Sequence, residues 1–154
     1  IIDKLRVKIP DISIRTTFIL GFPGETEEDF NTLCSFVEKY KLDNVGFFKY
    51  SKEEGTPASK FPNQVLQKIK SERLRKLSNI QYSIIRDKHL KDIGKTIECV
   101  VDEIVGNWAV CHSQSLCPTV DSVIYIPNNN VEIGKYYKIK ITNIRKYDYI
   151  GEIL

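Results

Sequence analysis

Hydrophobic and polar positions follow a strand, turn, helix, strand order over the first third of the chain. A β-branched apolar run at residues 14–20 predicts a buried strand. The run ends at Gly21-Phe22-Pro23-Gly24, where two glycines and a proline predict a tight turn. Thr26, with acids at the next three positions, predicts the capped start of a helix. A second apolar run at residues 45–50 completes a βαβ unit, whose two strands we expect to be parallel.

Two loops of this unit are expected at the same edge of the sheet. Ligands of βαβ units bind beyond the carboxyl ends of the strands, so Gly21–Thr26 is the first place to expect a site. Phosphate is excluded as its ligand, because no Lys-Ser or Lys-Thr pair follows the glycines and the acids after them would repel it. The polar segment Ser51–Gln64 follows the second strand, and it is either a functional loop or a plain surface connection.

A long helix is predicted from Val65 onward, with an apolar stripe that includes Leu77, Ile80 and Ile84. The flanks of this stripe are strongly basic, and the basic face has two interpretations. It either meets nucleic acid or is a solvated face on a helix that packs against a barrel, and we favour the solvated face. The basic positions are Lys68, Lys70, Arg73, Arg75, Lys76, Arg86 and Lys88.

The pattern changes after Gly94, where short β-prone runs separated by turn residues replace the helical spacing. Five such runs, TIECVVDEIV and YYKIKITNIRKY among them, predict a small antiparallel β-barrel. Gly106-Asn107, between the first two runs, is a hairpin turn signal. The predicted fold class is therefore α/β plus all-β, with one domain over residues 1–91 and a second over residues 92–154.

Charge divides the chain in the same way. Of the 154 residues, 1–91 carry 17 Lys and Arg against 12 Asp and Glu, and 92–154 carry 6 against 8. No apolar run approaches the length of a membrane span, so we expect no membrane association and a cytoplasmic location. The chain opens with IIDKLRVKIP, which has the pattern of a helix end and no initiating Met, and we expect a fragment of a longer protein.

The four cysteines give no metal-site signal. Cys34, Cys99, Cys111 and Cys117 form no Cys-x-x-Cys pair, and the last two, with His112 nearby, are spaced too loosely for a zinc site. We expect free thiols in a reducing cytosol.

Three stretches taken together resemble one family. GFPGETEEDF after a strand, a second strand that ends FFKYSKEEGTPA, and a long helix leading to a small barrel resemble the C-terminal part of the radical-SAM methylthiotransferases. The resemblance covers essentially the whole chain. It implies the end of a radical-SAM partial (β/α) barrel with its connecting helix, followed by the five-stranded OB-like barrel called a TRAM domain.

Within that family the chain resembles the branch that modifies a ribosomal protein. The run Arg15-Thr16-Thr17-Phe18-Ile19 and the stretch from Ser113-Gln114 to Val120-Asp121 are similar to this branch, whereas tRNA-modifying enzymes often carry Asp where Thr17 stands. The chain departs from the branch at Cys111-His112, where Gly-Arg is usual, and at Ser122, where Gly is usual. The branch methylthiolates the β-carbon of an aspartate in ribosomal protein S-twelve. The tRNA adenosine branch and a non-catalytic OB-like binding module stay open as alternatives.

The resemblance implies S-adenosylmethionine (SAM) and two 4Fe-4S clusters as cofactors. The clusters need cysteine sets that this chain does not contain, so we expect the chain to be inactive alone, with no catalytic residue and no metal ligand of its own. It would supply one wall of the SAM pocket. The residues that the resemblance assigns to this wall are Arg15, Ile19, Gly21, Phe22, Glu25, Phe48, Lys49 and Tyr50.

Two of these residues keep a second interpretation. Arg15 either points into the barrel toward a carboxylate of SAM or of the substrate, or is a strand-end arginine in solvent. Glu25 either contacts the cofactor or is a first-turn acid favoured by the helix dipole.

The acidic second domain suits a basic protein partner such as ribosomal protein S-twelve. RNA affinity depends largely on Lys and Arg, so we do not expect nucleic acid as a partner. The aromatic side chains of this domain could stack on bases, and we favour core and rim positions for them. They are Trp108, Tyr125, Tyr136, Tyr137, Tyr147 and Tyr149.

Overall fold

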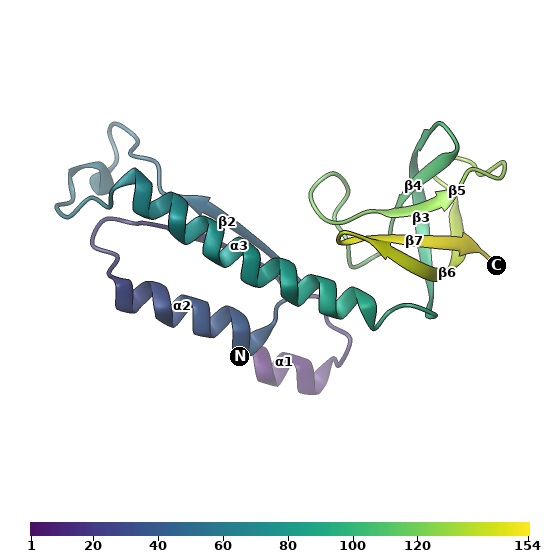
Figure 1. The fold of residues 1–154 in the computed structure, drawn as a ribbon, viewed down its shortest axis with the longest axis horizontal. Helices are drawn as coiled ribbons and strands as arrows, with labels where there is room; N and C mark the ends of the chain where they lie inside the picture. The colour runs from purple at the N-terminus through teal and green to yellow at the C-terminus, as the bar shows by residue number, and fades with distance from the viewer. The chain divides into compact units, whose positions relative to one another are not determined.

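The computed structural model describes all residues 1–154, which form two compact units, Ile1–Ile84 and Ile85–Leu154. The first unit contains α1 (Ile2–Lys8), β1 (Arg15–Leu20), α2 (Glu27–Tyr40), β2 (Asn44–Lys49) and most of α3 (Gln67–Leu90) (Figure 1). The predicted βαβ unit is confirmed, because β1 and β2 are hydrogen-bonded parallel neighbours.

The start of α2 is fixed by the predicted cap. The Thr26 hydroxyl accepts a hydrogen bond from the Asp29 backbone N–H at 3.1 Å, and the Asp29 carboxylate accepts one from the Thr26 N–H at 2.9 Å. These hydrogen bonds also lower the pKa of Asp29, because they favour its charged form. The helix ends at Lys41, whose left-handed backbone directs its N–H to the Val37 carbonyl at 3.0 Å.

The core of the first unit lies on one face of the β1–β2 pair, between the strands and the helices α2 and α3. Phe18 of β1 stacks on Phe47 of β2 with ring centroids 6.1 Å apart, and both pack against this core. The buried side chains of the core come from β1, α2 and α3: Leu20, Phe30, Cys34, Val37, Leu77 and Ile84.

Between β2 and α3 the polar loop contains one short 3-10 helix, η1 (Pro57–Lys60). The Gly24 N–H donates to the Asn63 carbonyl at 3.0 Å, which ties this loop to the turn after β1. On α3 the expectation of a wholly solvated basic face is wrong for two residues, because Lys70 and Arg73 are each only 6% exposed. Their partners lie far away in the sequence, so the helix alone did not show what would pair with these two charges.

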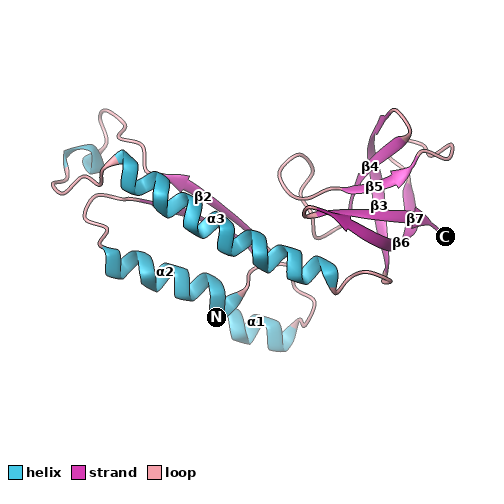
Figure 2. Ribbon diagram, in the orientation of Figure 1, coloured by secondary structure: helices cyan, strands magenta, loops and turns pink.

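The second unit is built around a closed barrel of β3 (Thr96–Val105), β4 (Trp108–His112), β5 (Ile124–Pro127), β6 (Tyr136–Arg145) and β7 (Asp148–Ile153) (Figure 2). The strands follow one another around it in the order β3-β4-β5-β7-β6. The five predicted strands are confirmed, but the barrel is not wholly antiparallel, because β5 and β7 pair in parallel. Strand directions cannot alternate all the way around a closed ring with an odd number of members, so at least one pair must be parallel.

The barrel interior is filled by alternate side chains of all five strands together with Val131. Register shifts in β3 after Val101 and in β6 after Ile141 bend these two long strands, as β-bulges do in small barrels. The buried members are Cys99, Val101, Ala109, Cys111, Ile124, Ile126, Val131, Ile139, Ile141 and Tyr149.

The C-terminal end of α3 is tied to the barrel within the second unit. His89 Nδ1 lies 2.6 Å from the Tyr147 carbonyl oxygen, and the His89 ring lies 4.0 Å from the Tyr149 ring. The Tyr149 hydroxyl donates to Asp92 at 2.8 Å.

The predicted division at residues 91 and 92 stays a prediction, and the compact units themselves divide inside α3. No helix of the chain combines the length and the apolar composition needed to cross a bilayer.

Candidate functional site

One face of the β1–β2 pair is turned away from α2 and α3 and carries exposed apolar side chains. Ile19 is 59% exposed and Phe48 is 61% exposed, and the strand register places them side by side. Thr17 and Gly46 are the preceding pair on the same face, where the Phe48 ring occupies the space next to the Gly46 backbone. Parallel strands are normally covered on both faces, so this open face is a candidate surface for a ligand or for further chain.

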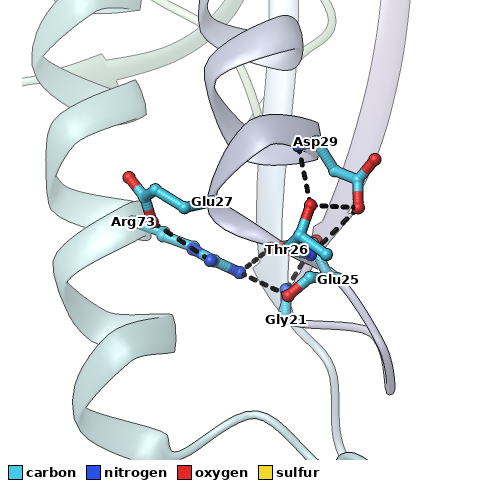
Figure 3. Close-up of polar contacts among 6 residues, drawn as sticks. All are labelled: Gly21, Glu25, Thr26, Glu27, Asp29 and Arg73. Atoms are coloured by element: carbon cyan, nitrogen blue, oxygen red, sulfur yellow. Dashed lines mark hydrogen bonds and ion pairs between the residues drawn. The ribbon is translucent and has the colours of Figure 1, made fainter.

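The turn after β1 closes on itself at the carboxyl edge of this pair. Gly21 and Gly24 both have positive φ, at +72° and +90°, which L-residues rarely adopt. The Gly21 N–H donates to the Glu25 carboxylate at 2.9 Å, and the Glu25 N–H donates to the Phe22 carbonyl at 2.9 Å. The Gly21–Glu25 contact and the adjoining cap of α2 are shown in Figure 3.

Glu25 is further held by Arg73 of α3. The second carboxylate oxygen of Glu25 forms an ion pair with an Arg73 guanidinium nitrogen at 2.5 Å, and the other terminal nitrogen lies 3.2 Å from Glu27 (Figure 3). The Glu25 and Arg73 side chains are both largely buried. Because protein donors occupy both of its carboxylate oxygens, the geometry favours Glu25 as a residue that holds the turn.

Tyr50 lies at the carboxyl end of β2, beside the same turn. Its N–H donates to the Leu20 carbonyl at 2.8 Å, and its own carbonyl accepts from Lys70 at 2.9 Å. The Phe22 ring meets the Tyr50 ring edge-on, with centroids 5.3 Å apart, and contacts Phe61 at 6.1 Å. The phenol oxygen of Tyr50 is buried and has no hydrogen-bond partner.

The predicted wall residues therefore fall into groups. Ile19 and Phe48 lie on the open face, and Phe22 meets Tyr50 at its carboxyl edge, in the turn that begins at Gly21.

Three of the predicted wall residues stand apart from that arrangement. Glu25 is committed to Gly21 and Arg73. Lys49 lies opposite Leu20, on the helix side, and its ammonium group lies 3.4 Å from Ser71 of α3. Arg15 is on the open face but at the opposite end of β1, about 20 Å along the strand from the turn at a rise of about 3.3 Å per residue.

Sequence reasoning missed Lys70 and Arg73 as parts of this arrangement. Both continue the buried stripe of α3 toward its N-terminus, at helical spacing from Leu77 and Ile84. The sequence did contain a signal, because charged residues at the positions of a buried stripe need buried partners. Glu25, an acid in the predicted turn, was a candidate for such a partner.

The residues 1–154 contain no group of three or more His, Cys, Asp or Glu that could hold a metal ion. Cys34 is buried in the first unit, Cys99 and Cys111 are buried in the barrel, and Cys117 is exposed. The hydrogen bond with Cys99 and the burial of Cys111 itself raise the pKa of Cys111, and a protonated thiol is a poor metal ligand. These cysteines do not fit an iron–sulfur cluster.

Comparison with known proteins adds a second line of evidence. Residues 93–154 match the model of the TRAM domain. The chain is 42% identical, over 99% of its length, to the ribosomal protein uS12 methylthiotransferase RimO of Clostridium botulinum, and covers 34% of that protein. It is 40% identical to the protein of the same name from Clostridioides difficile, covering 99% of this chain and 35% of that one. It is also 40% identical to the protein of the same name from Hahella chejuensis, covering 97% of this chain and 34% of that one.

Among solved structures, the apo form of Mycoplasma genitalium RNase R aligns with a TM-score of 0.33 and 16% identity, covering 58% of this chain and 18% of that one. At that TM-score the likeness defines neither fold nor function.

The closed barrel and the domain match define the class: this is a protein with a TRAM domain that follows a βαβ segment. Over nearly its whole length the chain is similar to proteins named RimO, which supports the family resemblance predicted from the sequence. It spans about a third of the length of the curated relatives that it matches.

Proposed function

We propose that the full-length protein carrying this chain methylthiolates the β-carbon of an aspartate in ribosomal protein uS12. The observation that supports this most strongly is an identity of 40–42%, over nearly the whole chain, to proteins named for that reaction. Thr17, which stands where tRNA-modifying relatives often carry Asp, supports the same choice.

The open face of the β1–β2 pair is the proposed wall of the SAM pocket. Its exposed apolar side chains, Ile19 and Phe48, suit a flat adenine ring that loses water on binding. The buried, unpartnered phenol oxygen of Tyr50 is a polar group that a ligand can satisfy. These residues fit the adenosyl part of SAM.

When bound, SAM supplies the radical chemistry and the methyl group of this family. The residues of this chain bind and orient it. Ile19 and Phe48 cover the ring and exclude water, and Phe22 and Tyr50 close the carboxyl edge. Gly21 shapes the turn at that edge, because its missing side chain leaves room for the Lys70 stem.

The other three predicted residues do not contact the adenosyl group in this proposal. Arg15, at the far end of β1, suits a carboxylate of the substrate better than the adenosyl group. Glu25 and Lys49 act from the helix side, Glu25 by holding the turn and Lys49 through its contact with α3.

The TRAM domain is the proposed docking module for uS12. Residues 92–154 carry 6 Lys and Arg against 8 Asp and Glu, which suits a basic ribosomal protein better than an RNA backbone. The proposal includes two 4Fe-4S clusters held by other parts of the full-length protein, a cytoplasmic location beside the ribosomes, and a domain division at residues 91 and 92.

The pocket is tested by SAM binding to the full-length protein with its clusters reconstituted. Ile19→Ala removes apolar surface from the open face, and we expect the Kd for SAM to rise about tenfold. Leu66→Ala is the matched control, since Leu66 is another exposed apolar residue of the first unit that lies outside the strands. An unchanged Kd in Ile19→Ala would contradict the proposed pocket.

A further inference from the structure

Two charged side chains of α3 are buried beneath the carboxyl ends of β1 and β2. Lys70 and Arg73 lie three residues apart on one face of the helix, and each is only 6% exposed. Such side chains are almost never fully buried unless they are paired, because removing a charge from water is costly. Their contacts therefore show which parts of the chain the two buried side chains hold in place.

Lys70 contacts the ends of both strands at once. Its ammonium group donates to the Tyr50 carbonyl at 2.9 Å and lies 5.0 Å from the centre of the Tyr50 ring. Its aliphatic stem fills the space beside Gly21, where a Cβ atom would lie 2.4 Å from Lys70 Cγ. One side chain thus sets the spacing between the turn after β1 and the residue after β2.

Arg73 fixes the same turn through a relay. Its guanidinium group pairs with Glu25, and the other carboxylate oxygen of Glu25 receives the Gly21 N–H (Figure 3). The same group also reaches the Glu25 carbonyl oxygen at 3.4 Å and stacks 5.2 Å from the Phe30 ring. The Gly21 amide is therefore held from α3 by two charge-assisted bonds in series.

This arrangement fixes geometry more than it adds stability. Buried ion pairs contribute little net stability, because desolvation offsets much of their attraction, and the Nε atom of Arg73 is left without a partner. What the two side chains supply is a defined position for three groups at the carboxyl ends of β1 and β2: the Gly21 amide, the Tyr50 carbonyl and the Tyr50 ring.

We infer that Lys70 and Arg73 are positioning residues for the SAM pocket, acting through Tyr50 and through Glu25. Neither touches the cofactor; each holds the carboxyl edge against which the adenosyl group rests. The inference depends on the proposed pocket on the open face. A shift of about 1 Å in such an edge is enough to weaken ligand positioning substantially.

The positioning role of Lys70 is tested with Lys70→Met in the full-length protein, with its clusters reconstituted. Methionine keeps an apolar stem beside Gly21 but cannot donate to the Tyr50 carbonyl. We expect the Kd and KM for SAM to rise about tenfold while kcat at saturating SAM changes less than threefold, with restoration by Lys70→Arg. Lys76→Met, which removes the same charge from an exposed position of the same helix, is the control and leaves Kd within twofold.

The positioning role of Arg73 is tested by comparing Glu25→Gln with Glu27→Gln. Both changes remove one negative partner of Arg73, but only Glu25 also holds the Gly21 amide. We expect about a tenfold higher Kd for SAM in Glu25→Gln and less than a twofold change in Glu27→Gln. Each variant is compared at a temperature at which thermal unfolding shows it fully folded.

The outcomes separate this inference from the pocket on which it depends. If Ile19→Ala weakens SAM binding but Lys70→Met and Glu25→Gln bind SAM like the wild type, the positioning role is overturned and the pocket stands. A loss of stability without a change in Kd likewise overturns it, because that is the result of a purely structural role. If Ile19→Ala has no effect either, the proposed pocket is contradicted, and the positioning role that depends on it is contradicted with it.

Discussion

Gly21→Ala is the substitution whose consequences follow most directly from the structure. Gly21 has φ +72°, and an added Cβ would lie 2.4 Å from Lys70 Cγ and 3.0 Å from Lys70 Cδ. The left-handed backbone costs an alanine about 1–2 kcal/mol. Displacing Lys70 also breaks its hydrogen bond to the Tyr50 carbonyl, and a hydrogen bond from a charged group contributes about 1.5–3 kcal/mol. We expect the first unit to lose about 2.5–5 kcal/mol in total.

Gly24→Ala is the matched control for this change. Gly24 also has positive φ, +90°, but nothing lies within 4 Å of the position of its Cβ. It should therefore show only the backbone cost of about 1–2 kcal/mol. The difference between the two variants measures the contact with Lys70.

Two spectroscopic signals allow each unit to be followed by itself in urea. Helix content at 222 nm reports mainly on residues 1–84, which contain α1, α2 and most of α3. Fluorescence of Trp108, the single tryptophan, reports on the barrel. Gly21→Ala should shift the helix transition and leave the fluorescence transition in place. Equal losses in Gly21→Ala and Gly24→Ala would refute the reasoning, as would full additivity of Gly21→Ala with Lys70→Ala.

Three further changes test other parts of the fold. Thr26→Ala should cost about 1 kcal/mol in the helix transition, because the Asp29 N–H loses its cap, whereas Thr26→Ser should cost little. Ile126→Ala should cost about 2–5 kcal/mol in the fluorescence transition, because Ile126 is fully buried in the barrel. Burial lowers the pKa of His89, so the folded state binds fewer protons than the unfolded state; barrel stability should be constant above about pH 6.5 and fall as the pH drops below it. His89→Asn keeps a donor for the Tyr147 carbonyl and should remove this pH dependence, and a slope that persists in the variant would point to other groups.

Local chemistry predicted the parts of the fold that depend on neighbouring residues. The cap at Thr26, the parallel strands on either side of α2 and the five barrel strands follow from periodicity and turn residues, and the structure confirms each. The parallel β5–β7 pair was missed because strand direction in a barrel depends on closure, which no single segment encodes.

The candidate site shows the same limit more sharply. Ile19 and Phe48 were predicted as pocket-wall residues from the resemblance alone; the strand pattern predicted a buried strand, whereas the structure leaves both side chains exposed on the open face. The burial of Lys70 and Arg73 depends on partners 20 and 48 residues away, so their helix alone appears amphipathic and basic. Arg15 and the turn come from one continuous motif, but an extended strand holds its two ends far apart.

The measurement that tests the proposed function most directly is mass spectrometry of uS12 and of tRNA after incubation with the full-length protein, its clusters reconstituted, together with SAM, reductant and sulfide as the source of sulfur. We predict that an aspartate of uS12 gains one methylthio group and that tRNA is unchanged, and that Ile19→Ala slows the reaction at limiting SAM. Modification of a tRNA adenosine with uS12 left unmodified would contradict the proposed function.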